Sequence, residues 1–529
     1  MKLIYDVKDR PKIGQTIIFA IQQLLAIMAA TLVVPVIVGH GMQPTAALFG
    51  AGVGTLVYLL FTKFRSPVFL GSSFAFLGSM AAAFVGGVSV ALGYLGLIFG
   101  AILAGLVYVV IAIVVKFAGV KWINKLMPAV VIGPTVAIIG LSLAGNAVGD
   151  LQTVNYVQNY NSNDYQVVAL TTEYGYDENG DVLLDGKTIS SYVVVDRDVT
   201  VTDKIPADKI HSEITAEPVE DGDFKLTSVP GNTKVAIVCG LVTLAVTMLC
   251  SVYAKKKNLF RLIPFIVGIC AGYICALIFF LIGKATGNAS LMIIDLSPFA
   301  GLLTDGKVTV NTFVSLPQFT FLTAFGGFGE LNGAYIGTLV AAYVPVAFVV
   351  FAEHIADHKN ISSIIEKDLL VDPGLHRTLL GDGVGSMAGA FFGGCPNTTY
   401  GESIGCVAIT GNASVITIVF AAIGAIIISF LSPFVAFVNS IPKCVMGGVC
   451  MALYGFIAVS GLKMVQKVDL EDNKNLFVVS VILIAGIGGL AISFGQVTIT
   501  EVACALILGI LTNLMLSRKS KKAEAEKKE

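Results

Sequence analysis

Charged residues are scarce in this chain. Asp, Glu, Lys and Arg make up 13% of its 529 residues, whereas soluble domains carry about 25%. Histidine occurs five times and tryptophan once. No HExxH motif is present, and neither Ser/His/Asp nor Cys/His spacing suggests a nucleophilic site. These absences argue against a soluble domain, a zinc hydrolase and an intramembrane hydrolase.

Cysteine is absent from the one long hydrophilic segment, 148–232. Such a distribution indicates small buried hydrophobic side chains, not a disulfide framework or a CxxC metal site. The N-terminus also has no signal-peptide features, because its first fifteen residues are mostly charged or polar. The nine cysteines fall in or beside apolar stretches, at positions 239, 250, 270, 275, 395, 406, 444, 450 and 504.

Apolar residues, in contrast, are abundant. They form 55% of the chain, and the mean hydropathy is +0.84. Runs such as "TIIFAIQQLLAIMAATLVVPVIVG" reach the roughly 20 residues that a helix needs to cross a bilayer. The sequence therefore predicts an all-α polytopic membrane protein with about fourteen spans. They lie near 15–39, 45–62, 68–86, 90–116, 128–147, 234–254, 262–283, 335–362, 378–394, 399–411, 413–433, 442–460, 475–494 and 497–516.

Lys and Arg gather in the N-terminus, in alternate loops and in the basic tail 517–529. The positive-inside rule then places both termini in the cytoplasm and 148–232 outside the cell. Between Asp150 and Pro230 there are 16 acidic and 5 basic residues, with alternating stretches such as "SYVVVDRDVTV". These features predict a small acidic flap rich in β-hairpins. A poorly ordered insertion without a function is the alternative.

Two short interrupted spans resemble each other. "GSSFAF" at 71–76 and "NTTYGE" at 397–402 each place two hydroxyl residues before an aromatic one, and "PAVVIGP" and "PKCVMGG" follow them in the same order. Each half has seven spans, and because this number is odd, the second half enters the membrane from the opposite side. The two repeats are therefore inverted relative to each other. Paired interrupted segments are typical of a transporter site near the bilayer midplane. Extended backbone at that depth is tolerated where it lines a cavity. The half-helix that follows it then points its N-terminus, the positive end of its dipole, at the same cavity.

Carboxylates inside spans are the strongest functional signal. Glu402 follows the second interruption, and Glu353 lies in "VVFAEHIADHKN" (349–360). Ionisable groups at this depth are costly and usually mark a substrate or proton pathway. Two alternatives remain open. The transmembrane helix could end at Glu353, which would then be exposed to water, and Glu402 could be a buried structural carboxylate that is hydrogen-bonded within the protein. His354 and His358 have the i, i+4 spacing of zinc ligands, but further ligands are not evident, so we expect no metal and no cofactor.

Two carboxylates, two sets of free amides and two aromatic side chains suit a flat, neutral ring with alternating N–H and C=O groups. Carboxylates accept from ring N–H groups, amides donate to ring carbonyls, and Phe74 and Tyr400 cover the ring. Burial disfavours the charged form of a carboxylate, so such a group can take up a proton and couple transport to a proton gradient. An anion site would instead require basic or dipolar groups.

Six motifs carry a family resemblance. The chain resembles bacterial uracil permeases of the nucleobase–cation symporter-2 (nucleobase–ascorbate transporter) family. The motifs occur in the family's order and cover nearly the whole chain except 148–232. They are "TLVVPV", "LGSSFAF", "AEHIADHKNISSII", "KDLLVDPGLHR", "PNTTYGESIG" and "ALYGFIAVSG".

The resemblance implies fourteen spans in two inverted seven-span repeats, with short antiparallel strands in spans 3 and 10. It divides the chain into spans 1–5 (1–147), the extracellular insertion (148–232), gate spans 6–7 (233–290) and a connecting segment (291–334). Core spans 8–11 (335–433), gate spans 12–14 (434–516) and the tail (517–529) follow. Spans 1–4 belong to the core and span 5 to the gate.

The resemblance also implies a function, a proton-driven symporter that imports uracil through the cell membrane by alternating access of core against gate. Protons, membrane lipid and a second copy of the chain are the expected partners, and nucleic acid is not. A purine-base transporter of the same fold is the alternative, although Glu at position 402 is typical of uracil-type members. An anion carrier or channel is a further alternative.

Site residues follow from the same resemblance. Glu353 and Glu402 would bind the ring N–H groups, and the backbone amides of Phe74 and Gly401 would hold the carbonyls. Glu353 would also couple to protons. The remaining candidates are Ala30, Tyr400 and Tyr454, which would line the pocket, and Asp357, which would complete the proton-coupling pair.

Two departures from the family pattern stand out. Ser403 occupies a position where the family has Asn, and Gln23 stands where the family has His. At Ser403 we expect some hydrogen bonding of the pocket to be lost or replaced, and any role of the family's His does not carry over to Gln23. His354 and His358 have no assigned role, and we expect at least one of them to be structural or at the cytoplasmic boundary.

Overall fold

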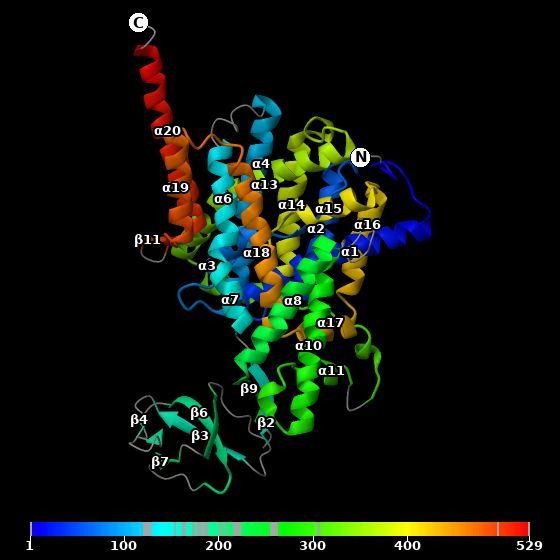
Figure 1. The fold of residues 1–529 in the computed structure, drawn as a ribbon, viewed down its shortest axis with the longest axis vertical. Helices are drawn as coiled ribbons and strands as arrows, with labels where there is room; N and C mark the ends of the chain where they lie inside the picture. Colours follow the sequence, from blue (N-terminus) through cyan, green and yellow to red (C-terminus); the bar gives the residue numbers. More distant parts are fainter. Residues whose placement is uncertain are drawn as a thin grey trace.

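The computed structural model is mostly helical (Figure 1). Eight of its described helices are long and apolar enough to cross a membrane. The structure describes residues 3–119, 128–152, 155–160, 165–171, 175–176, 182–183, 189–199, 204–206, 209–214, 224–253, 263–303, 307–494 and 497–526.

The first part of the chain forms a helical bundle that is interrupted by one short strand. Its elements are α1 (Ile13–Val38), α2 (Pro44–Phe61), β1 (Leu70–Ser72), η1 (Phe74–Phe76), α3 (Leu77–Ala82), α4 (Val90–Ala118), α6 (Ala129–Ser142) and α7 (Ala144–Gln152).

Helices resume after the insertion and run to the second interruption. These elements are α8 (Thr233–Tyr253), α10 (Pro264–Thr286), η3 (Ala289–Leu291), α11 (Ser297–Ala300), η4 (Val310–Thr312), α12 (Thr320–Ala324), η5 (Phe325–Glu330), α13 (Gly333–Ile365), η6 (Leu370–Gly374), α14 (Leu375–Gly393) and β10 (Asn397–Thr399).

The last part follows β10 directly and is again helical. Its elements are α15 (Gly401–Thr410), α16 (Val415–Ile428), α17 (Ser432–Asn439), α18 (Lys443–Val465), α19 (Asn473–Ile487), β11 (Ile492–Phe494), β12 (Val497–Ile499) and α20 (Glu501–Glu526). β11 and β12 pair antiparallel.

The insertion forms strands, as its alternating sequence predicts. β2 pairs with β9, β6 joins β3 to β8, and β5 joins β4 to β7, all antiparallel. In Figure 1, β3, β6 and β7 lie apart from the helices, beyond one end of the bundle. The strands are β2 (Asn155–Tyr160), β3 (Tyr165–Thr171), β4 (Gly175–Tyr176), β5 (Val182–Leu183), β6 (Ile189–Asp196), β7 (Lys204–Ile205), β8 (Ile210–Ile214) and β9 (Phe224–Pro230).

The helices expose large apolar side chains on their outer faces. On α4, Val110 is 59% exposed and Phe117 is 81% exposed, and on α10 Ile274 and Leu281 are each 56% exposed. A water-soluble protein would bury such rows of side chains. Lipid is the solvent that accepts them without cost.

β1 and β10 meet in the middle of the bundle. They pair antiparallel, with Gly71 opposite Thr398. Two further backbone bonds extend the pairing, since Ser73 N–H donates to the Pro396 carbonyl at 2.9 Å and Tyr400 N–H to the Phe69 carbonyl at 3.2 Å. The Leu70 N–H bonds instead to α2, where it donates to the Thr55 hydroxyl at 2.9 Å. Both segments are extended because each finds in the other the hydrogen-bond partners that a helix would supply internally.

Small residues allow α2 and α14 to pack closely around this crossing. A Cβ atom on Gly50 would lie 2.3 Å from the Gly389 carbonyl oxygen, and one on Gly54 would lie 2.6 Å from the Gly385 oxygen. Helices in membranes associate through such small-residue contacts because lipid provides no hydrophobic driving force between them. The Asn397 side chain fits into the same seam and donates to the Gly50 carbonyl at 3.2 Å.

We predict that Gly50→Ala destabilises the fold. The added methyl group has no space against α14, and overpacking of this kind costs about 1–3 kcal/mol of unfolding free energy. Gly14→Ala is the matched control, because no atom lies within 4 Å of a Cβ built on Gly14. Thermal unfolding of the detergent-purified variants measures the difference. Equal melting temperatures for the two variants would contradict the close packing.

Candidate substrate-binding site

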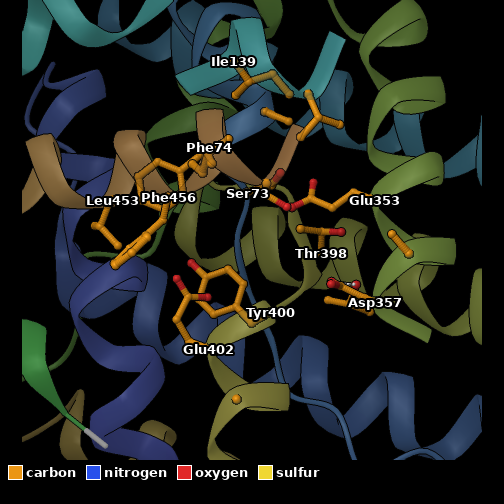
Figure 2. A pocket seen from close by; sticks show the side chains of 18 of the residues that line it. Ser73, Phe74, Ile139, Glu353, Asp357, Thr398, Tyr400, Glu402, Leu453 and Phe456 are labelled. Carbon is orange, nitrogen blue, oxygen red and sulfur yellow. Dashed lines mark hydrogen bonds between the residues drawn. The ribbon is translucent and has the colours of Figure 1, made fainter. Parts of the chain in front are cut away.

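A cavity of about 510 Å³ opens beside the β1–β10 crossing (Figure 2). Its walls come from two sets of elements. One set consists of α6, α8, α10 and α18, and the other consists of α13, α15, η1 and β10. The lining residues are Ser73, Phe74, Ala75, Val136, Ile139, Ser251, Pro264, Phe265, Glu353, Ala356, Asp357, Thr398, Thr399, Tyr400, Gly401, Glu402, Gly405, Ile409, Leu453, Phe456, Ile457, Ser460 and Met464.

Two helix starts border the cavity. α15 begins at Gly401, with Tyr400 as the one residue between it and β10, and the 3₁₀ turn η1 begins at Phe74 directly after the extended residue Ser73. The first N–H groups of a helix have no partner within the helix. Phe74, Gly401 and Glu402 all line the cavity, so the cavity lies at both of these starts.

Glu353 and Asp357 both line the cavity from α13. They are four residues apart and therefore lie on one face of the helix. The Thr399 hydroxyl of β10 donates to Asp357 Oδ2 at 2.8 Å. α13 continues to Ile365, and Ile361 and Ile365 are buried. This excludes the alternative in which the helix ends at Glu353 as a solvated cap.

Tyr400 is held in place by β1. Its hydroxyl donates to the Ser72 carbonyl at 2.6 Å, and a Cβ atom on Gly71 would lie 2.3 Å from its ring. Glycine at position 71 is thus required by the ring that covers it. Because its hydroxyl proton is already used, Tyr400 presents its ring and backbone to the cavity.

Ala30 and Tyr454 are not on the cavity wall. Ala30 is 1% exposed on α1, and Tyr454 is 2% exposed on α18. The Tyr454 ring lies edge-on to Phe74, with 6.0 Å between the ring centroids. Tyr454 therefore supports a residue of the wall, whereas the other predicted residues line it directly.

Further hydroxyl and aromatic side chains, which are not among the site residues expected from the sequence, complete the cavity wall. Ser73, Thr398 and Thr399 come from the two short strand motifs, and Phe456 and Ser460 come from α18 (Figure 2). The paired hydroxyls were visible in the two repeated motifs, but nothing in the sequence of α18 indicated which of its faces borders the cavity.

The cavity is acidic. Its ionisable side chains are the carboxyl groups of Glu353, Asp357 and Glu402, and the described lining residues include no Lys, Arg or His. Among the described parts of the chain, no group of three His, Cys, Asp or Glu side chains could hold a metal ion. The arrangement can accept hydrogen bonds from N–H groups and bind protons, and it would repel an anion.

The two departures from the family pattern contact each other. The Gln23 side-chain amide donates to the Ser403 hydroxyl oxygen, which also accepts the Phe69 N–H at 3.0 Å. Gln23 and Ser403 are 2% and 0% exposed. This bond ties α1 to the first turn of α15 and to the residue preceding β1. The two altered positions are thus hydrogen-bonded to each other, and neither of them lines the cavity.

The sequence matches the profile of a permease family over residues 14–172 and 223–494. The chain belongs to this permease family. The match leaves out 173–222, which lies inside the insertion. Members of the family are permeases, so the chain is a multi-pass membrane transport protein and not an enzyme. The family resemblance of the motifs is confirmed.

Curated relatives cover nearly the full chain. The uracil permease of Bacillus caldolyticus is 35% identical over 99% of this chain and 97% of its own length. The uracil permease of Bacillus subtilis is 33% identical over 100% and 98%, and that of Escherichia coli K12 is 32% identical over 96% and 93%.

Solved structures show the same fold at low sequence identity. The transmembrane domain of the cyanobacterial bicarbonate transporter BicA matches with a TM-score of 0.55 and 12% identity, covering 96% of this chain and 99% of that domain. The murine anion transporter Slc26a9 matches with a TM-score of 0.56 and 10% identity, covering 97% of this chain and 69% of its own.

We predict that Gln23 and Ser403 are energetically coupled. Ser403→Ala leaves the buried Gln23 amide and the Phe69 N–H without the acceptor that they share, which costs about 1–3 kcal/mol for each group. Gln23→Leu removes only the Gln23 bond, because Ser403 still accepts from Phe69. The double variant should cost clearly less than the sum of the two single variants, because both remove the same bond. Thermal unfolding of the four proteins gives the coupling energy, and Gln43→Leu, at the partly exposed start of α2, is the control. Strict additivity would contradict the contact.

Proposed function

We propose that the chain is a nucleobase transporter that imports uracil together with protons. The observation that carries the proposal is the meeting of Glu353 and Glu402 in one cavity, beside the helix starts at Phe74 and Gly401. Uracil presents two N–H groups and two carbonyl groups around a flat neutral ring. The carboxylates accept from the N–H groups, and the backbone amides donate to the carbonyls.

The remaining wall suits a planar ring. Phe74, Tyr400 and Phe456 supply apolar faces, while Ser73 and Thr398 offer hydroxyl groups that both donate and accept. Ligand sites commonly combine such apolar surfaces with a few oriented polar groups. Ala30 and Tyr454 complete the proposed site from behind the wall, by packing and not by contact with the base.

The names of the relatives support a pyrimidine substrate. Uracil permeases are 32–35% identical to this chain over nearly its whole length, and a putative pyrimidine permease, RutG of Escherichia coli, is 28% identical. The anion transporters that share the fold do not favour an anion substrate here, because three carboxylates line the cavity. A purine base of the xanthine type is the alternative that an uptake experiment must exclude.

Asp357 and Glu353 form the proposed proton-coupling pair. They are one helical turn apart and both line the cavity, where each negative charge disfavours the other. One proton entering with the substrate would relieve this repulsion. Asp357 is further linked to β10 through Thr399, so a change in its protonation acts on the strand that precedes Gly401 and Glu402.

The position of the cavity supports alternating access as the proposed mechanism. It lies between the proposed core, with α13 and α15, and the proposed gate, with α6 and α18. Rocking of one group against the other would open the cavity to either side. The proposed architecture has fourteen spans in two inverted repeats, related across the β1–β10 pair. The protein is proposed to lie in the cell membrane as a homodimer, with both termini cytoplasmic.

We predict gradient-driven uracil uptake. Proteoliposomes that contain the purified chain should accumulate radiolabelled uracil when the outside is more acidic than the inside, and a protonophore should abolish the accumulation. Protein-free liposomes are the control, and unlabelled uracil and xanthine are the competitors. Xanthine uptake without gradient-dependent uracil accumulation would overturn the proposal.

We predict that each carboxylate of the site is required for binding. Glu402→Gln and Glu353→Gln keep the side-chain shape but remove a charged acceptor, which costs about 1.5–3 kcal/mol and thus about 10–100-fold in affinity. Glu330→Gln is the control, because Glu330 is exposed and bonds to Ser89 at 2.7 Å outside the cavity. Calorimetric titration with uracil measures the affinities. Unchanged affinity in either site variant would remove that residue from the site.

A further inference from the structure

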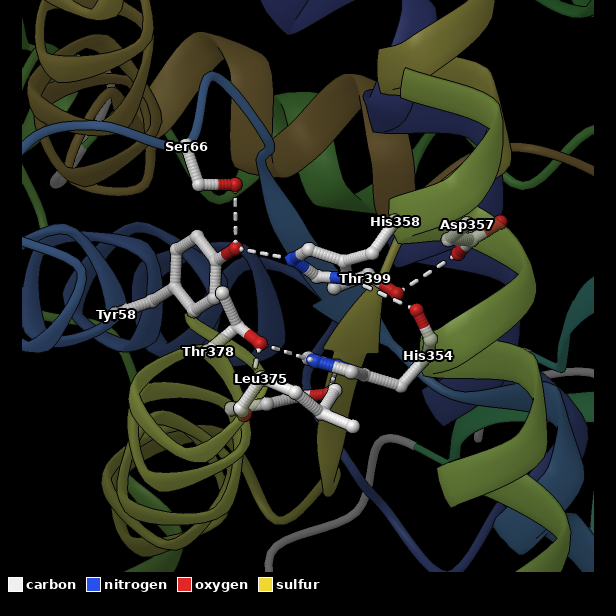
Figure 3. Close-up of polar contacts among 9 residues, drawn as sticks. Tyr58, Ser66, His354, Asp357, His358, Leu375, Thr378 and Thr399 are labelled. Atoms are coloured by element: carbon white, nitrogen blue, oxygen red, sulfur yellow. Dashed lines mark hydrogen bonds and ion pairs between the residues drawn. The ribbon is translucent and has the colours of Figure 1, made fainter. Parts of the chain in front are cut away.

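Each of the two histidines of "VVFAEHIADHKN" directly follows a carboxylate of the site on α13, yet both face elsewhere. Successive helical residues are about 100° apart, so the ridge of His354 and His358 lies beside the ridge of Glu353 and Asp357. Both histidines are 0% exposed. Their rings stack with 4.0 Å between centroids, and they reach toward α14 and α2 (Figure 3). Neither lies at a water boundary.

His354 bonds to α14 through both ring nitrogens. Its Nδ1 lies 2.6 Å from Asp382 Oδ2, and its Nε2 lies 3.0 Å from the Thr378 hydroxyl. Asp382 is also 0% exposed. The bonds therefore join two ionisable groups in the dry interior of the bundle, where an unpaired charge would be very costly.

The hydrogen-bond partners fix the proton count of this pair. The Thr378 hydroxyl donates to the Leu375 carbonyl at 3.1 Å, so its oxygen accepts from a proton on His354 Nε2. One further proton then lies between Nδ1 and Asp382 Oδ2. Whether that proton sits on the ring or on the carboxyl group, the pair carries no net charge.

His358 fastens the same helix to α2. Its Nδ1 donates to the His354 carbonyl at 2.8 Å, which holds the ring along the helix. Its Nε2 lies 2.8 Å from the Tyr58 hydroxyl, which is hydrogen-bonded to Ser66 at 2.6 Å. α13 is therefore bonded to two neighbouring helices on the side away from the cavity (Figure 3).

We propose that His354 is a positioning residue: it shares one proton with Asp382, keeps this buried pair at zero net charge, and fixes the rotation of α13 that turns Glu353 and Asp357 into the cavity. The inference rests on the proposed function for its transport readout, but its structural part does not depend on the substrate. It assigns proton exchange to the cavity carboxylates and not to the pair.

The titratable groups around the pair are Glu353, Asp357 and His358 on α13, Tyr108 on α4 and Tyr58 on α2. The Tyr108 ring centroid lies 6.3 Å from that of His354. A change of net charge at the pair would therefore act on the cavity carboxylates and alter the pH profile of transport, whereas a neutral replacement would not.

The test compares His354→Gln, Asp382→Asn and the double variant in the full chain, with exposed His40→Gln as the control. His354→Gln removes the ring nitrogen that shares a proton with Asp382, and breaking one side of a buried pair is strongly destabilising. We expect its KM for uracil to rise by at least about tenfold and its ligand-free melting temperature to fall. The double variant has neither ionisable group and keeps a side-chain amide at each position, so its KM should return to within about threefold of the wild type.

Three results would overturn the inference. They are a wild-type KM and melting temperature in His354→Gln, a double variant as impaired as the worse single variant, and a double variant whose uptake has lost the wild-type pH profile. The last would place the pair on the proton pathway. If the wild type neither binds nor carries uracil, the proposed function fails, while the ligand-free melting temperatures of the four proteins still decide whether the pair is coupled.

Discussion

The antiparallel pairing of β1 with β10 is the contact on which the site depends. Backbone in the middle of a membrane bundle must find its hydrogen-bond partners within the protein, and these two segments find them in each other. Because each strand then leads into a helix, two sets of N-terminal amides border the same cavity. Gly71 is needed for this geometry, since the Tyr400 ring lies against it, and the Gly50–Gly389 contact brings α2 and α14 close enough to enclose the pair.

The polar chemistry of α13 is divided between two sides of one helix. Glu353 and Asp357 face the cavity and are available to a substrate or a proton, whereas His354 and His358 are bonded to α14 and α2. A helix with this many ionisable groups can be tolerated in a membrane only if those away from water are paired. The histidines meet that requirement, and in doing so they determine which groups remain free for transport.

Much of the site could be predicted from the sequence. The carboxylates at positions 353 and 402 and the strand motifs were recognisable, because charges and interrupted helices are conspicuous in an apolar chain. The role of the α18 residues could not be predicted from the sequence. α18 is apolar on all sides, so the face that borders the cavity is defined only by the neighbouring helices. Tyr454 illustrates this, because it packs behind Phe74 while Phe456, two residues later, lines the cavity.

The sequence by itself determined that this chain crosses a membrane, that its interior contains two broken segments, and to which family it belongs. Composition and local motifs are sufficient for these conclusions, because bilayer thickness and backbone hydrogen bonding constrain each segment separately. Only the tertiary structure decided which polar groups meet. Gln23 with Ser403 and His354 with Asp382 are pairs between distant segments, and such contacts depend on how the helices pack and rotate, which no single segment specifies.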